Sequence, residues 1–283
     1  MKFNFQQCTR LVLSSLTLLL CAQGAQAGLM LYPTRIELEK NQRAAQVELT
    51  NTGKTPETYR ISIVNLRMGE NGEFTTIQAP GPGEQFAGPL LRFSPRQVTI
   101  APGGSQVVRI LVRKPAGLAT NEYRSHLQFD RVADVVGASS VEQGDKNAEP
   151  AIMLKVTALI GASIPVIVRH GATQARATLS DVALAPPTAQ ESGPVLTYQI
   201  KRSGNRSVFG DLTATFTPRG GQPLELAKAG GVAVYVPNTV RRVRMNLTVP
   251  PGVALSKGAL NLTFRERTNA GGKLIAESSL PLP

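Results

Sequence analysis

Residues 91–129 read LRFSPRQVTIAPGGSQVVRILVRKPAGLATNEYRSHLQF, and they decide the fold of this chain. Apolar residues recur at every second position along 106–113 and 122–129, and Pro/Gly turns separate these segments. Alternation with a period of two between such turns is typical of antiparallel strands with one buried face. We therefore predict strands over 96–100, 106–113 and 122–129.

The rest of the chain repeats this pattern, and no amphipathic helix interrupts the first half. Regular short strands with frequent turns predict an all-β sandwich or barrel on each side of a boundary at His170-Gly171. We expect a first unit over 28–170 and a second over 171–283. The further predicted strands are 29–38, 45–50, 58–64, 152–168, 176–184, 195–202, 212–218, 232–236, 239–249, 258–267 and 273–280.

The first 27 residues predict a cleavable secretory signal peptide. They combine a basic start with an apolar run over 11–21 and end in Ala25-Gln26-Ala27, a small-x-small cleavage site. The alternative, lipidation at Cys21, is disfavoured because Leu20 precedes it where a small residue is preferred. No later segment is apolar enough to span a bilayer, so we expect no membrane insertion.

Composition excludes several classes of site. Both cysteines, Cys8 and Cys21, lie in the signal, so the secreted chain has no disulfide and no thiolate metal site. Lys2 and Arg10 account for two of the +12 net charges, which leaves +10 after cleavage. The basic residues are spread along strands without a nucleic-acid motif, so we expect no nucleic acid as a partner.

The sequence contains no recognisable catalytic site. The secreted chain has two histidines, His126 and His170, and neither has a second ligand at metal spacing. Pro102-Gly103-Gly104 lies between two predicted strands and opens no helix, so it is a turn and not a phosphate cradle. We expect no enzyme activity, no cofactor and no metal.

One predicted strand is apolar on both faces. Exposed apolar strands invite pairing with another chain, so the strand over 152–160 is either covered internally or made to be paired, and the residues leave both readings open. The polar stretch 133–150 before it is either a loop or an extension of that edge. The residues that point one way are Ile152, Leu154, Val156, Ala158 and Ile160.

The order and spacing of several segments resemble the periplasmic chaperones of the chaperone–usher pilus pathway (PapD-like), in a divergent branch. These segments are TRIEL, VELTNTG, TYRI, RFSPRQVTIAPG, VRILVRKP, EYRSHL and KRSGNRSVFGDL. The resemblance implies two immunoglobulin-like β-sandwich domains, joined at an angle with a cleft between them. It also implies a periplasmic protein whose partners are pilus subunits and an outer-membrane usher, and whose 152–160 strand completes the unfinished subunit fold.

The resemblance further implies a basic pair in the cleft that binds the terminal carboxylate of the pilus protein. Arg35 in TRIEL matches the first member of this pair. Pro165 stands where the family has its second basic residue, a lysine. Arg124, on the strand face of His126, or Arg92 could supply the missing charge.

Two other secreted, immunoglobulin-like classes compete with the chaperone. A structural pilus subunit or adhesin usually needs an extended N-terminal donor segment, yet this chain enters a strand almost at Gly28. A carbohydrate- or surface-binding module normally uses exposed aromatic residues, and the chain has no Trp and five Tyr.

Overall fold

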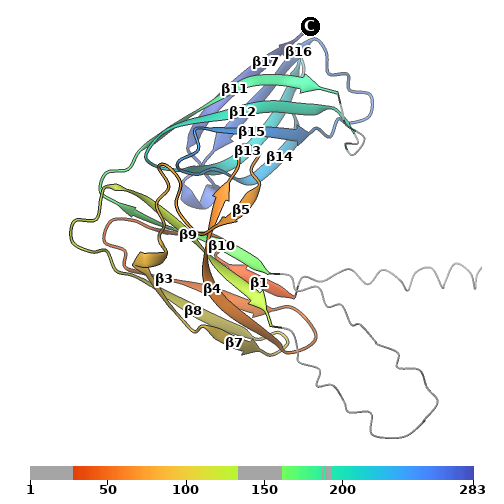
Figure 1. Ribbon diagram of the computed structural model, residues 1–283. Coiled ribbons are helices and arrows are strands. Elements are labelled where there is room, and N and C mark those ends of the chain that lie inside the picture. The colour runs from red at the N-terminus through yellow and green to blue at the C-terminus, as the bar shows by residue number, and fades with distance from the viewer. Residues whose placement is uncertain (1–27, 133–160, 187, 189–190, 192) are drawn as a thin grey trace, which may run out of the picture.

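The computed structural model describes residues 28–132, 161–186, 188, 191 and 193–283 (Figure 1). The predicted signal peptide, the polar stretch 133–150 and the predicted donor residues over 152–160 lie outside the described residues. Among those that are described, no helix has the length and apolar character needed to cross a bilayer.

The first sandwich consists of two sheets, named here after a central strand. The β8 sheet has the order β1 (Leu29–Tyr32), β3 (Ala44–Asn51), β8 (Ser105–Val112) and β6 (Leu91–Ser94). The β9 sheet has the order β2 (Ile36–Leu38), β10 (Ala162–His170), β9 (Asn121–Arg131), β4 (Glu57–Met68) and β5 (Phe74–Ile77), and β7 (Gln97–Ile100) also pairs with β4. The β10–β2 pair is parallel. A short 3-10 turn, Gly88–Leu90, precedes β6.

The alternation read from the sequence is confirmed in β8. Val108 and Ile110 are fully buried, whereas Leu111 between the buried positions is 56% exposed. From the facing β9 sheet, Leu127 and Phe129 pack into the same core. Period-two alternation therefore separates the core face of β8 from its solvent face.

The second sandwich also has two sheets, so the prediction of an all-β chain with two sandwiches is confirmed. Tyr198, Phe216 and Phe264 are its largest buried side chains. Its sheets have the orders β11 (Ala175–Ala185), β12 (Val195–Gly204), β15 (Val240–Asn246) and β14 (Leu224–Val234), β13 (Val208–Pro218), β16 (Gly258–Arg265), β17 (Leu274–Leu282), with a 3-10 turn at Thr268–Ala270.

The structure corrects some predicted strand boundaries. The segment 29–38 forms two strands, because the chain leaves the β8 sheet at Pro33 and joins the β9 sheet at Ile36. Strands β5 and β6 were not predicted. Strand β14 begins at Leu224, well before the predicted 232–236, since Gly230-Gly231 inside it hid its continuity.

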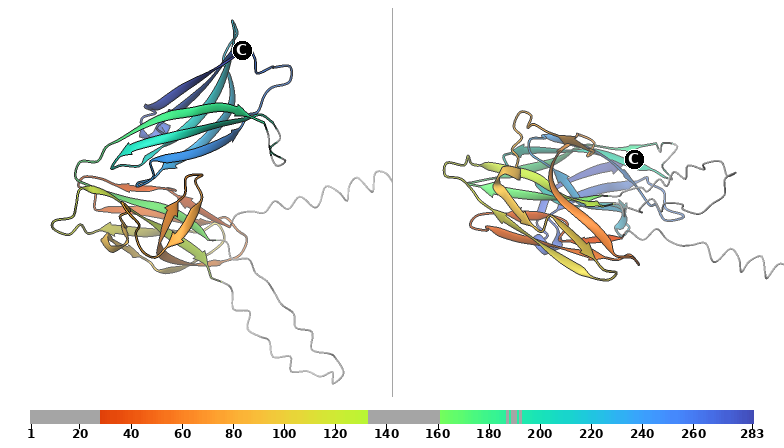
Figure 2. Two further views of the ribbon diagram at one scale, coloured as in Figure 1. Left: turned by 45° about the horizontal axis from the view of Figure 1, so that its top comes forward. Right: turned by 60° about the horizontal axis from the view of Figure 1, so that its bottom comes forward.

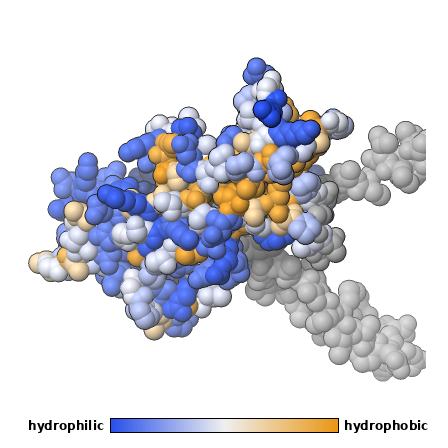
Figure 3. Space-filling model, turned by 90° about the horizontal axis from the view of Figure 1, so that it is seen from above, coloured by the Kyte–Doolittle hydropathy of each residue, from blue (hydrophilic) through white to orange (hydrophobic). Residues whose placement is uncertain are grey.

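The two sandwiches pack against each other. They diverge from the side where the chain passes from β10 to β11, as Figures 1 and 2 show. Met68 and Ile167, from the first sandwich, belong to the apolar core of the second. The β4–β5 hairpin also reaches across, and Asn238 Nδ2 donates a hydrogen bond to the Met68 carbonyl at 2.7 Å. Seen from above, an apolar band crosses an otherwise mainly hydrophilic surface (Figure 3).

Candidate functional site

The outer face of the β9 sheet carries the polar residues that meet the second sandwich. Along β9, Tyr123 and Leu127 point into the first core. Because side chains alternate along a strand, Glu122, Arg124 and His126 point the opposite way. Both Glu122 and His126 are nonetheless buried, since this face of the sheet is covered.

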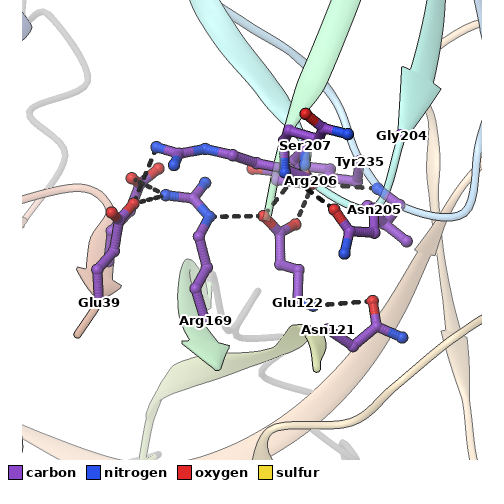
Figure 4. A network of polar contacts seen from close by, with 12 residues as sticks. Glu39, Asn121, Glu122, Arg169, Gly204, Asn205, Arg206, Ser207 and Tyr235 are labelled. Atoms are coloured by element: carbon purple, nitrogen blue, oxygen red, sulfur yellow. Dashed lines mark hydrogen bonds and ion pairs between the residues drawn. The ribbon is translucent and has the colours of Figure 1, made fainter. Parts of the chain in front are cut away.

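A buried ion-pair network joins the sandwiches near residue 170 (Figure 4). Arg169 Nε lies 2.9 Å from Glu122 Oε2, and Arg169 Nη1 lies 2.7 Å from Glu37 Oε2 and also contacts Glu39. From the second sandwich, the Ser207 amide donates to Glu122 Oε2 at 3.1 Å and its hydroxyl donates to Glu122 Oε1. The network therefore ties Ser207 to strands β2, β9 and β10.

Neighbouring charges and burial shift the pKa of Arg169 in opposite directions. Burial lowers its pKa, but the carboxylates of Glu122 and Glu37 more than compensate and raise it above its ordinary value. Sequence reasoning missed this network. The available signal was a single arginine at the end of an otherwise apolar strand, SIPVIVR.

Arg35, the residue before β2, lies between the two sandwiches. Its Nε donates to Glu37 Oε1 at 2.6 Å and its Nη1 donates to the Tyr235 hydroxyl at 2.9 Å. Its guanidinium carbon lies 4.3 Å from the ring centroid of Phe209 in β13. Its Nη2 is buried without a hydrogen-bond partner among the described residues.

Arg124, like Arg35, packs against the ring of Tyr235. Its guanidinium carbon is 4.2 Å from the centroid of Tyr235, the residue that follows β14, and that of Arg35 is 5.3 Å from it. Within the described chain, Nη1 of Arg124 is also buried without a partner, and burial lowers the pKa of this guanidinium. The structure thus brings two of the three predicted anchor residues together.

His126 is the third polar group of this cluster. It is 3% exposed, and its Nδ1 has no hydrogen-bond partner in the described part of the chain. The Phe74 ring packs edge-on against it at 5.7 Å. Burial, and then the charges of Arg124 and Arg35, lower the pKa of His126 to about 3, so the imidazole is neutral at ordinary pH. We name Arg35, Arg124 and His126 the anchor cluster.

Arg92, the remaining predicted anchor, is placed elsewhere. It lies in β6 of the other sheet, is exposed, and donates to the backbone carbonyl of Leu91 at 2.8 Å. The structure therefore does not bring Arg92 to the cluster.

An open cleft of about 1140 Å³ borders the site. It runs between the β1–β2 connection and strands β11 and β17 of the second sandwich, and Arg35 and Phe209 are among its lining residues. In the parts of the chain that the structure describes, no three His, Cys, Asp or Glu side chains lie close enough together to hold a metal ion.

Comparisons with known proteins give one family model and several solved structures. Residues 36–134 match the model of an Fn3-like domain. No curated protein sequence matches the chain. The chain is similar to three solved structures, each over 90% of its length. The YadV chaperone is 10% identical (100% of that chain, TM-score 0.46), the Pseudomonas aeruginosa CupB2 chaperone 14% (100%, TM-score 0.43) and the E. coli chaperone DraB 13% (98%, TM-score 0.41).

Proposed function

We propose that this protein is a periplasmic chaperone that binds and stabilises pilus subunits and delivers them to an outer-membrane usher. The observation that carries the proposal is the pair of partly buried guanidiniums, Arg35 and Arg124, that share the Tyr235 ring between the two sandwiches. Each has an unpartnered nitrogen among the described residues.

The chemistry of this pair favours a carboxylate ligand. A buried N–H without an acceptor costs about 1–3 kcal/mol, and more for a charged group. A carboxylate would satisfy such donors, and the planar guanidinium fork matches its two oxygens. The terminal carboxylate of a protein chain bound between the sandwiches has the required charge and shape. We therefore assign Arg35 and Arg124 to binding the carboxyl terminus of a pilus protein, and we leave Arg92 out.

The edge of β10 supports strand donation. Within the described residues, β10 pairs with β9 from Ala162 to His170 but with β2 only from Val166 to Val168. Residues 162–165 therefore have no neighbouring strand on the β2 side within that part of the chain, and the apolar segment 152–160 precedes them directly in the sequence.

In the proposed function, the segment 152–160 adds a strand to the open sheet of a pilus protein. Main-chain hydrogen bonds would satisfy that sheet edge, and alternate side chains would fill its groove. Each large apolar side chain buried in this way contributes about 1.5–3 kcal/mol, enough for several to offset the cost of association. The donor residues are Ile152, Leu154, Val156, Ala158 and Ile160.

Co-expression with candidate pilin-like proteins tests the proposal. We expect the tagged protein to co-purify with one such pilin at equal stoichiometry and in high salt. Replacing Leu154 and Val156 by Asp should abolish the complex. Replacing Lys155 and Thr157 by Asp is the matched control, because the alternating sequence pattern predicts that these residues point away from the donor face. Equal recovery with both double variants would contradict strand donation.

A further inference from the structure

The registers of β10 with β9 and with β2 place His126 on one side of Pro165 and Arg35, the residue before β2, on the other. In the β10–β9 register Pro165 is opposite His126, and in the β10–β2 register Val166 is opposite Ile36. Arg35 therefore lies beside Pro165. Neighbouring strands are about 4.8 Å apart, so the backbones at Arg35 and His126 are separated by about 10 Å, a span that their side chains can bridge through a bound carboxylate.

Pro165 itself cannot bind an anion. Its ring has no polar atom and its nitrogen carries no hydrogen. The residues on either side of it each have one buried polar atom without a partner among the described residues, Nη2 in Arg35 and Nδ1 in His126. A neutral imidazole nitrogen without a proton would repel a carboxylate oxygen, whereas a protonated one would donate to it.

We infer that His126 is the protonatable member of the carboxylate site, so that a terminal carboxylate enters this site together with a proton on His126. The inference rests on the proposed function, since it deepens the role of the same site. A protonated His126 would supply the positive charge that Pro165 cannot.

The charged groups that face His126 explain why binding and protonation are coupled. Arg124 faces it from β9 and Arg35 from the residue before β2, and both charges oppose the imidazolium. Tyr235 lies close by, in contact with Phe74. The neighbours on β10, β4 and β5 are Pro165, Val64 and Phe74, which do not titrate.

In the free protein, burial and the two guanidiniums therefore keep the imidazole neutral. A carboxylate between the guanidiniums offsets their repulsion and accepts a hydrogen bond from the ring, and both effects favour the imidazolium. By linkage, a ligand that promotes proton uptake binds more tightly as pH falls. Affinity for the carboxylate should rise by up to about tenfold per pH unit below the pKa that His126 has in the complex.

Nuclear magnetic resonance of the secreted protein, labelled in its histidine and arginine side chains, tests this inference. His126 and His170 are the only histidines, so both can be followed. The probe is N-acetyl-trialanine with a free carboxylate, and the matched control is the same peptide with a C-terminal amide. With the carboxylate, we expect the pKa of His126 to rise from about 3 by about three units or more, so that the ring is protonated in the complex near pH 6. With the amide it should not change, and His170 should respond to neither.

Two other outcomes overturn the inference and separate it from the proposed function. If the side-chain signals of Arg35 respond to the carboxylate peptide while the titration of His126 stays the same, His126 has no such role and the carboxylate site stands. If neither residue responds, the carboxylate site fails as well. Strand donation then still depends on the co-expression experiment. The test reads His126 in the unmodified chain, so it does not depend on a variant that folds.

Discussion

Arg169 and Glu122 form a buried ion pair, 2.9 Å between Nε and Oε2, at the junction of the two sandwiches, where their side chains are 4% and 1% exposed. Arg169 lies near the end of β10 and Glu122 near the start of β9, and Ser207 of the second sandwich donates to the same carboxylate. The pair lies in the first sandwich, and Ser207 links it to the second.

Removing the Glu122 charge should destabilise the protein strongly. Glu122→Gln leaves Arg169 buried with one carboxylate fewer, and breaking a buried pair from one side costs about 3–5 kcal/mol. We expect a loss of that order in the free energy of unfolding, measured by urea denaturation.

The matched control is Glu70→Gln. Glu70 also pairs with an arginine across the sandwiches, Arg242, but both side chains are more than half exposed. Exposed pairs contribute at most about 1 kcal/mol, so the change should be small. Equal losses for the two variants would show that burial does not decide the strength of these pairs.

Truncation of two neighbouring residues of β8 should change stability by very different amounts. Ile110→Ala leaves a cavity in the first core and should cost about 2–5 kcal/mol. Leu111→Ala removes a side chain that already faces solvent and should change stability by less than about 0.5 kcal/mol. Thermal unfolding of the two variants measures both effects, and similar losses would contradict the strand orientation.

Such alternation explains which parts of the fold the sequence could predict. Strands β8 and β9 alternate apolar and polar residues with a period of two, and this pattern is visible in the sequence. Strand β5 does not, because Phe74-Thr75-Thr76-Ile77 is largely exposed and packs only through part of its length. The split of 29–38 into two strands depends on which sheet each half joins, and local sequence does not contain that information.

The site could be predicted only in part for a related reason. The sequence places Arg124 and His126 on one strand face, and the resemblance points to Arg35. Their meeting depends on Tyr235, which is far beyond Arg124 in the sequence and reaches them through the packing of the second sandwich. The same packing buries His126, which period-two alternation alone assigns to an exposed face. Arg92 is also an arginine near a predicted strand, and the sequence alone does not show that it lies on the other sheet.

His126 should make the free protein less stable in acid. Its pKa is about 3 when folded and about 6.5 in an unfolded chain. Between these values the unfolded chain binds the extra proton, so stability falls as pH decreases from about 6.5 towards 3, by at most about 1.4 kcal/mol per pH unit. His126→Gln should flatten this slope in urea denaturation at several pH values.

His170→Gln is the control for that experiment. His170 is the other histidine of the chain and lies partly exposed at the end of β10, so the comparison separates the effect of His126 from the general effect of removing a histidine. An unchanged slope in His126→Gln would mean that the imidazole of His126 already carries a proton in the folded protein.

The three candidate anchors should separate clearly in carboxylate binding. Arg35→Ala and Arg124→Ala each remove one guanidinium of the partly buried pair, and loss of a charge-assisted hydrogen bond of about 1.5–3 kcal/mol weakens binding by about 10- to 100-fold. Arg92→Ala should have no effect, because Arg92 is exposed on the other sheet. Calorimetric titration with the free-carboxylate peptide measures all three. A loss in Arg92→Ala equal to that in Arg35→Ala would contradict the placement of the site.

Replacing Pro165 by Lys should remove the need for a proton on His126. The ammonium would lie between Arg35 and His126 in the strand register, and parallel pairing with β2 begins only at Val166, so the new side chain enters at the edge of that ladder. A fixed positive charge supplies the attraction that protonated His126 would otherwise give. Peptide affinity at pH 8 should then increase, and its rise towards acid pH should be smaller than in the original chain.

Pro165→Ala removes the ring without adding charge and should keep the original pH dependence. If Pro165→Lys binds no more tightly than Pro165→Ala at pH 8, the carboxylate does not lie above this residue.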